Sequence, residues 1–494
     1  MSVTERLSAL TPEQRALFEA LRRRQQESAA AKLLLPPAVP RVTGPTAAGD
    51  WPLAIDQERL WRMHRENPGL VSWNVDAASR MHGEIRVPAL IAALREIIRR
   101  HAAWRATFPV VDGRPVQRVA GDVADVDFAV IDLTALPVER RETEGRRDLF
   151  DRTRAVFDLE HGPLVRAALV RTDELEHLCL LTVHHIATDW ITFQIAFQEL
   201  MGLYEAARVG APSPYPEPAL QFPDYAVWER EWWSGEALDD YTEFWRRELA
   251  GFPLVLDLPG DRIRPPAQSQ RGGMIPFSSG PEPAHRLRAL ARREGVTTFM
   301  ALLAVVDALL FRLTGREKLV VGSNSANRPR PELEPMLGQF LTQVPFAVDL
   351  GGDPTFRELL ARVKRSSLAA YTHQNMPFDK LVDVLEPEPD PARNPVVQVL
   401  LLVLAGQSHG GGEDVDSEAV PLFDGNSRWD LMFGLYDYDD LGFTGPVEFN
   451  ADILDRATVE RWLGLFRRIV DCVVASPEVR LSQLPSLASF PEAA

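Results

Sequence analysis

The sequence has 494 residues, of which 45% are hydrophobic and 25% are charged, a composition typical of a soluble globular protein. Its net charge of −16 makes nucleic acid and anionic membrane surfaces unfavourable partners unless a local basic patch exists. The sequence contains no run of about 18 apolar residues, so no membrane span is predicted. Two cysteines, Cys179 and Cys472, exclude a disulfide framework and, with no secretory apolar segment at the start, indicate a cytoplasmic protein.

The N-terminal segment, residues 1–50, is predicted to be a helix followed by a linker. Residues 4–28 carry Leu17 and Leu21 at helical spacing. Residues 35–50 are rich in proline, glycine and small side chains, which favours a linker. The helix is either a solvated tail or a docking helix toward a neighbouring domain, and the sequence leaves both interpretations open.

From residue 52 onward the chain alternates predicted helices and strands. Residues 87–101 place six apolar side chains on one helical stripe. Residues 178–183 form an almost wholly apolar run, which is typical of a buried central strand. Residues 191–204 return to helical spacing, so the segment 178–204 is predicted to be a strand, a loop and a helix.

The second half of the chain repeats this alternation. The aromatic-rich segment 222–245 is the predicted boundary between the two halves. Beyond it, periodicity predicts helices over residues 284–295, 298–314, 355–370 and 456–476, and strands over residues 318–322 and 396–404.

A tandem histidine motif, His184-His185-Ile186-Ala187-Thr188-Asp189, lies between the predicted strand and the predicted helix. Strand ends in α/β proteins open onto ligand crevices, and an imidazole with its ordinary pKa of about 6.5 accepts protons near neutral pH. The motif therefore predicts either a catalytic base or, in the simpler interpretation, a structural histidine that is hydrogen-bonded to backbone. The aspartate is placed to cap the helix, pair with an arginine or shape the loop.

Other chemistries have less support in the sequence. Adjacent histidines on a strand point to opposite faces and do not readily share one ion, so no metal site is predicted. A Ser-His-Asp hydrolase would need a G-x-S-x-G elbow, which is missing. Nucleotide binding would need a P-loop or a G-x-G-x-x-G segment, and neither is present.

An ordered series of motifs resembles the condensation-domain family of nonribosomal peptide synthesis and spans about residues 52–480. The motifs are residues 52–61, similar to S-x-A-Q-x-R-L-W; 100–108, similar to R-H-E-x-L-R-T-x-F; 157–159 with 162–164; 184–189, similar to H-H-x-x-x-D-G; 222–228, similar to Y-x-D-Y-A-x-W; 372–378, similar to H-Q-x-x-P-F; and 390–395, which ends in R-N-P.

This resemblance implies an α/β fold of two chloramphenicol-acetyltransferase-like lobes, residues 51–225 and 226–494, which form a V with a central tunnel. It implies that phosphopantetheine arms of partner carrier proteins enter the tunnel from opposite ends, and that the chain binds no cofactor of its own. An acyl or aminoacyl thioester would be transferred to an amine, or to a hydroxyl, to form an amide or an ester.

The resemblance also implies roles for individual residues. His185 would deprotonate or orient the nucleophile, while His184 would point to the opposite side and be structural. Asp189 would pair with Arg328 and hold the loop, and Arg105 would be a further structural residue of the active site.

Several residues depart from the family pattern. Trp190 replaces the glycine of H-H-x-x-x-D-G, Thr342 and Gln343 replace an Asn-Thr pair, and Trp104 replaces leucine. The first three are predicted to lie along the tunnel. A family glycine usually marks a close approach of the backbone, so we expect the Trp190 indole to point into the tunnel rather than outward into the core.

Several functions compete with carrier-dependent acyl transfer. A catalytically degenerate domain that recruits carrier proteins or tailoring enzymes is favoured by Trp190 and disfavoured by the intact His185 and Asp189. Relatives that use coenzyme A would carry D-F-G-W-G, heterocyclising relatives would carry aspartates in place of the histidines, and epimerisation has no specific support. The sequence leaves open the donor, the acceptor, the donor stereochemistry, the choice of amide or ester, and whether the protein is free-standing or part of a larger synthetase.

Carrier docking would need a local basic patch on this acidic chain. One candidate cluster is Arg286, Arg288, Arg292 and Arg293, on a predicted helix; the alternative is an ordinary solvated helix face.

Overall fold

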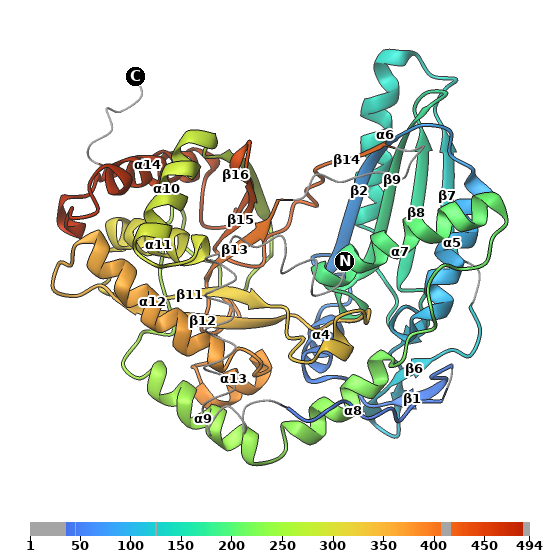
Figure 1. The fold of residues 1–494 in the computed structure, drawn as a ribbon, viewed down its shortest axis with the longest axis horizontal. Helices are drawn as coiled ribbons and strands as arrows, with labels where there is room; N and C mark the ends of the chain where they lie inside the picture. Colours follow the sequence, from blue (N-terminus) through green and yellow to red (C-terminus); the bar gives the residue numbers. More distant parts are fainter. Residues whose placement is uncertain (1–35, 45, 124–125, 407–415, 488–494) are drawn as a thin grey trace.

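The computed structural model describes residues 36–44, 46–123, 126–406 and 416–487, so the predicted helix 4–28 lies outside the described residues. The described chain forms two α/β lobes arranged as a V, with helices between them at the base (Figure 1). The predicted α/β class with two lobes is therefore what the structure shows.

The first lobe is built on a five-stranded sheet of described strands. The strand order is β14 (Asp416–Ala419), β2 (Asn74–His82), β9 (Glu176–His184), β8 (Val165–Arg171) and β7 (Asp127–Asp132). Helices α5 (Val87–Arg100) and α7 (Trp190–Val209) pack together, and α6 (Val138–Thr153) contacts β2, β8 and β9. Alternate residues of β8 enter two core clusters, because successive side chains of a strand point to opposite faces.

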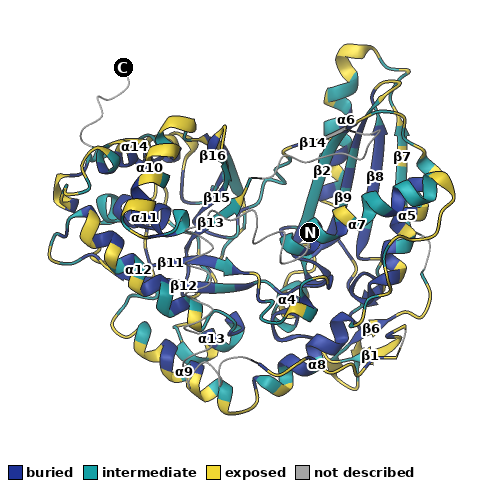
Figure 2. Ribbon diagram, viewed as in Figure 1, coloured by how far each residue is buried: buried dark blue, intermediate teal, exposed yellow. Residues whose placement is uncertain are grey.

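The second lobe is built on a six-stranded sheet of described strands. The strand order is β10 (Gly272–Ser278), β16 (Gly442–Asn450), β15 (Leu431–Tyr438), β13 (Val399–Ala405), β11 (Lys318–Ser325) and β12 (Thr342–Asp349). Its helices are α10 (Pro281–Arg293), α11 (Thr298–Thr314), α12 (Phe356–Thr372) and α14 (Arg456–Ala475). Helix α11 is apolar on nearly all sides and lies at the centre of this lobe's core (Figure 2).

The boundary between the lobes falls within two consecutive helices. Helix α8 (Phe222–Trp232) sends Phe222 and Trp228 into the core of the first lobe, whereas α9 (Glu236–Glu248) sends Tyr241 into the core of the second. Helices α4 (Ile55–Glu66) and α13 (Phe378–Leu385) contact each other between the lobes.

The position of strand β14 differs from the prediction that residues 51–225 form one lobe and residues 226–494 the other. It comes from the second half of the sequence but pairs antiparallel with β2, so it belongs to the sheet of the first lobe. Arg80 on β2 pairs with Glu418 on β14 at 3.0 Å. An open strand edge offers unpaired backbone groups, and β14 covers the edge of β2. The sequence of β14, DSEA, has no apolar alternation that would have indicated a strand.

The described part of the predicted linker 35–50 is packed against α8. The backbone amides of Val42 and Thr43 both donate to Asp224 Oδ1 at 2.7 Å, and Trp228 Nε1 donates to the carbonyl of Pro37 at 3.1 Å. These bonds attach the segment to the first lobe.

Across the described residues, we find no single helix with both the length and the apolar composition needed to cross a membrane. Helices α10 and α11 reach the required length and composition only as a pair, and they are bent by 107° at their junction.

Candidate functional site

His185 lies where β9 ends and a short 3-10 turn, His185–Ala187, begins. Its backbone amide donates to the carbonyl of Trp73 at 2.7 Å, which fixes the turn to the loop before β2. Its Nδ1 lies 2.9 Å from the carbonyl oxygen of Thr188. Because a carbonyl only accepts, Nδ1 carries the proton, and Nε2 of the neutral ring is left with a free lone pair.

Burial and charge both favour the neutral form of this ring. Burial of the imidazole, reinforced by the positive charge of Arg428, lowers the pKa of His185 to about 4. The ring packs edge-on against Trp73, with centroids 5.7 Å apart. At neutral pH the ring of His185 is therefore neutral, with the lone pair of Nε2 not protonated.

His184 has the opposite arrangement. Its side chain is 1% exposed, and its Nδ1 accepts from the backbone amide of Ile186 at 3.1 Å. Its ring packs edge-on against His64 and Phe157. Burial lowers the pKa of His184 well below its ordinary value, so this histidine is a neutral packing group that also caps the turn.

Asp189 is completely buried and connects the two lobes. Its Oδ1 accepts from the amide of Thr192 at 2.6 Å, which caps the first turn of α7. Its Oδ2 accepts from the amides of Phe340 and Leu341, in the loop before β12, at 2.9 and 3.3 Å. The carboxylate thus holds the start of α7 against a loop that comes from the second half of the chain and packs Phe340 into the core of the first lobe.

Arg328 lies next to Asp189, as the sequence predicted, but its ion pair is long, with Nη2 3.8 Å from Oδ1. The shorter contacts of Arg328 are to the carbonyls of Leu333 and Met336, at 2.5 and 2.6 Å, and to Thr192 Oγ1 at 3.1 Å. Backbone amides therefore dominate the surroundings of Asp189, and the arginine orders the loop that supplies them.

Gln57 supports the histidine turn, a role that the residue pattern alone did not indicate. Its Nε2 donates to the carbonyl of Ile186 at 2.8 Å, and its Oε1 accepts from the amide of Ala54 at 3.0 Å. Its position in the motif 52–61 was the available signal, because that motif includes a glutamine.

Trp190 is half-buried and faces the second lobe. Its ring contacts Tyr436 on β15 edge-on, with centroids 6.3 Å apart. Its Nε1 is buried without a hydrogen-bond partner. The indole thus lies at the junction of the lobes rather than in the core of the first lobe.

Thr342 and Gln343 are neighbours on β12 and so point to opposite faces of the sheet. Thr342 is 2% exposed; its hydroxyl donates to the carbonyl of Met376 at 3.2 Å and accepts from the amide of Phe378 at 2.8 Å. The Thr342 side chain is thus held by the start of α13, and it also interacts with Asp56 of α4, where the two lobes meet. Gln343 is half-buried, opposite Asn324 of β11.

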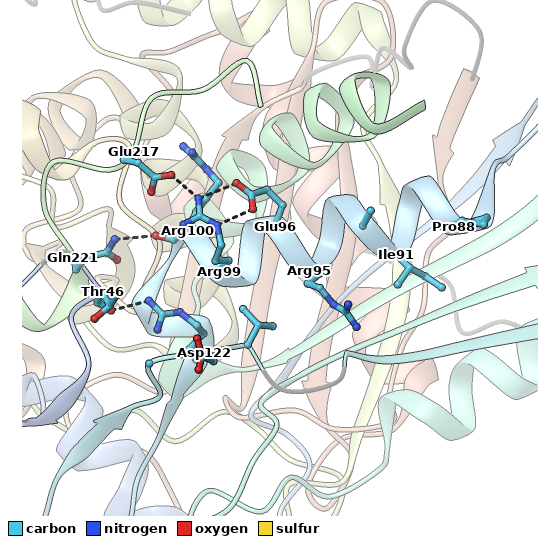
Figure 3. A pocket seen from close by; sticks show the side chains of 14 residues that line it. Thr46, Pro88, Ile91, Arg95, Glu96, Arg99, Arg100, Asp122, Glu217 and Gln221 are labelled. Carbon is cyan, nitrogen blue, oxygen red and sulfur yellow. Dashed lines mark hydrogen bonds and ion pairs between the residues drawn. The ribbon is translucent and has the colours of Figure 1, made fainter. Parts of the chain in front are cut away.

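Arg105 lies apart from the histidine motif. It donates to the carbonyls of Ala120 and Thr46, the latter at 2.9 Å. It lines a cavity of about 670 Å³ beside α5, together with Arg99 and Glu96, and no residue of the motif 184–190 lines that cavity (Figure 3). These contacts of Arg105 stabilise the first lobe, and its role as a structural residue of the active site stays a prediction.

The candidate basic cluster lies on α10. Arg286, Arg292 and Arg293 are exposed, whereas Arg288 is half-buried and bound to Asp437 and the carbonyl of Tyr438. Three of the four side chains are therefore available at the surface. Within the described residues, no group of three or more histidine, cysteine or acidic side chains is placed to hold a metal ion.

Comparison with known proteins gives the chain a consistent set of relatives. A family model described as "Condensation domain" matches residues 47–493. One of the linear gramicidin synthase proteins of Brevibacillus parabrevis is 36% identical over 437 residues, which cover 88% of this chain and 9% of that protein. The chain thus spans less than a tenth of that relative's length.

Solved structures share the fold. The X-domain from teicoplanin biosynthesis is 31% identical, with a TM-score of 0.82, and the match covers 91% of this chain and 100% of that one. The same domain in a complex with OxyB is 30% identical, with a TM-score of 0.80, over 91% of this chain and 98% of that one. The condensation domain of monacolin K polyketide synthase MokA, at 22% identity, has a TM-score of 0.77 over 88% of this chain and 99% of that one.

Proposed function

This chain belongs to the condensation-domain family of nonribosomal peptide synthetases, and from that premise we propose that it joins a carrier-bound acyl group to an amine or hydroxyl acceptor. One observation carries the proposal. His185 presents an unprotonated Nε2 that has no hydrogen-bond partner among the described residues, on a turn held by Gln57, Trp73 and Asp189. A fixed imidazole with a free lone pair is suited to accept a proton from a nucleophile.

The proposed reaction balances without a cofactor. The acceptor nitrogen attacks the thioester carbonyl carbon, a C–N bond forms, and the C–S bond breaks. The proton lost by the nitrogen passes to His185 Nε2 and then to the departing thiolate, so that the products are an amide and a free pantetheine thiol. Proton transfer of this kind contributes typically about 10²–10⁴-fold to the rate.

The substrates are proposed to arrive on phosphopantetheine arms of partner carrier proteins, in a tunnel between the two lobes. Tethering both reactants raises their effective concentration, which supplies a second large part of the acceleration. The exposed arginines Arg286, Arg292 and Arg293 are a candidate surface for carrier docking. We also propose a cytoplasmic location, with which the free thiols of Cys179 and Cys472 are compatible.

Recruitment of another protein is the second candidate function. It is favoured by the similarity to the teicoplanin X-domain, which has been solved in a complex with OxyB. Trp190, in place of the family glycine, also favours it, because an indole at the lobe junction restricts the space for substrates.

Incubation of the protein with an acyl-loaded carrier protein and an amine should distinguish the two candidates. We expect a new amide, detected by mass spectrometry, that forms faster than in a control with the acyl carrier and amine alone. No product above that control, over a panel of donors and amines, combined with stable binding of a tailoring enzyme, would favour recruitment over catalysis.

Replacement of Trp190 by glycine should broaden the range of acceptors and preserve the fold. The half-buried indole packs across the lobe junction against Tyr436, so its removal opens space there rather than in a core. Rates with amines of graded size, beside a thermal melt, measure both effects.

The matched control is Trp245→Ala, since Trp245 is 1% exposed in the core of the second lobe. That change should lower the free energy of unfolding by about 3–5 kcal/mol without altering acceptor choice. A Trp190→Gly protein that loses as much stability and keeps the original acceptor range would contradict the gating role.

A further inference from the structure

Arg428 is a positively charged side chain at the junction of the lobes, just before β15. Its guanidinium lies over the ring of Trp73, 4.6 Å from the centroid, and over Trp429 at 5.2 Å. Trp73 belongs to the first lobe and also contacts His185. Arg428 and His185 therefore pack against the same indole, and the charge of Arg428 is felt by the imidazole.

The guanidinium of Arg428 donates no hydrogen bond and forms no ion pair within the described part of the chain. Its nitrogens are also not among the buried donors that lack partners, so they are accessible to a ligand. A half-buried guanidinium remains charged, and its partial desolvation without an anion costs free energy. An anionic ligand would recover that free energy.

The carboxylates near Arg428 do not neutralise it. Glu448 on β16 is buried, and burial raises its pKa to about 7, so a large fraction of it is uncharged at neutral pH. Asp424 accepts hydrogen bonds from the backbone amide and the side-chain amide of Asn426, at 2.9 and 2.8 Å. Both carboxylates act on Arg428 only through longer-range attraction.

The backbone that carries Arg428 is firmly held. Its carbonyl accepts from Gln268 Nε2 at 3.0 Å and from Asn394 Nδ2. The amide of Ser427 donates to the carbonyl of Gln270 at 2.8 Å. With the two indoles that flank the guanidinium, these bonds orient the cation before any ligand arrives, which reduces the entropy lost on binding.

Two tryptophans next to the histidine motif also carry donors without partners. The indole N–H of Trp73 and that of Trp190 are both buried without an acceptor. Trp73 contacts His185, and Trp190 directly follows Asp189. The immediate surroundings of His185 thus contain the unpaired donor of Trp73 and the cation of Arg428, an arrangement that favours an anionic oxygen.

We propose that Arg428 is the anion-recognition residue of a subsite beside His185, and that this protein selects a substrate whose acyl or acceptor group carries a carboxylate. The inference rests on the proposed function in that the ligand is expected on a pantetheine arm between the lobes. The carboxylate would accept charge-assisted hydrogen bonds from the guanidinium, which are about twice as strong as neutral ones.

Binding of two matched ligands to the full chain tests the subsite without any need for turnover. Succinyl-pantetheine and butyryl-pantetheine are similar in size and differ in the terminal carboxylate. By calorimetry we expect the succinyl thioester to bind at least about tenfold more tightly, which corresponds to about 1.4 kcal/mol. Arg428→Gln should remove this preference, and Arg428→Lys should retain part of it because the charge remains.

Two controls make the result specific. Arg467→Gln removes an exposed arginine that stacks on Phe277, and it should leave the preference unchanged. His185→Ala should also retain the preference, since the imidazole does not bind the carboxylate. If the protein prefers the succinyl thioester but shows no condensation activity, the subsite is supported and the proposed function is contradicted.

Three results would overturn the subsite. One is equal affinity of the unaltered protein for the two thioesters. The second is a preference that survives in Arg428→Gln. The third is an equal loss of affinity for both ligands in that variant, which would make Arg428 a general binding or folding residue. Thermal melts of every variant identify a folding defect.

Discussion

Replacement of His185 by alanine is expected to lower turnover at least about 10²-fold and to shift the melting temperature by no more than a few °C. The reaction loses its proton acceptor, whereas the fold loses only a half-buried ring and one hydrogen bond to Thr188. The measurement is single-turnover amide formation from an acyl-loaded carrier, beside a thermal melt.

The control for this variant is His82→Ala, which removes an exposed imidazole at the end of β2. It should leave both turnover and melting temperature unchanged. Turnover that persists at the original rate in His185→Ala would show that the imidazole is not the base.

The protonation state of His185 gives a second measurement of the same role. Since burial and Arg428 lower its pKa to about 4, the ring should stay neutral from pH 7 down to about pH 5 and gain a proton only near pH 4. An NMR titration, with the signal assigned by its loss in His185→Ala, measures this directly. Arg428→Gln should raise the pKa because a repelling positive charge is removed. A pKa near 6.5 in the unaltered protein would contradict the neutral ring.

Replacement of Asp189 by alanine is expected to lower the free energy of unfolding by about 3–5 kcal/mol. The change leaves the amides of Thr192, Phe340 and Leu341 without their acceptor, and Arg328 without its nearest carboxylate. These groups are buried, so water does not readily replace the lost bonds. Urea unfolding and expression yield measure the loss.

Thr355→Ala is the matched control, because Thr355 caps α12 by accepting from the amide of Glu358, and this bond lies wholly within the second lobe. Loss of an ordinary cap costs about 1 kcal/mol. If Asp189→Ala costs no more than Thr355→Ala, the link to Phe340 and Leu341 contributes little. A variant of normal stability that has lost activity would instead indicate a direct chemical role for Asp189.

Asp189→Asn tests the electrostatics of the same position. The amide retains one oxygen acceptor but turns an N–H group toward either the Thr192 amide or the loop amides, where a donor then faces a donor. We expect a loss of stability of the same order as in Asp189→Ala.

Local periodicity was sufficient to predict six of the eleven described α-helices and three of the described strands. The pattern over residues 298–314 coincides with α11, and the apolar run 178–183 lies within β9. Residues 87–101 correspond to α5. These segments were predictable because each buries a continuous apolar stripe or face, which the order of residues displays directly. Strand β14 was not predictable from periodicity, because its pairing with β2 joins residues that are far apart in the chain.

The sequence by itself determined the family, the two-lobed α/β class and the position of the tandem histidines at a strand end, because these depend on short motifs and local spacing. Only the tertiary structure decided which nitrogen of His185 is free, which amides Asp189 accepts from, which backbone groups Thr342 and Arg105 bind, and that Arg428 stands beside His185. Each of these depends on contacts between segments that are distant in sequence. The strength and direction of a hydrogen bond or a charge interaction are set by distance in space, which spacing along the chain does not encode.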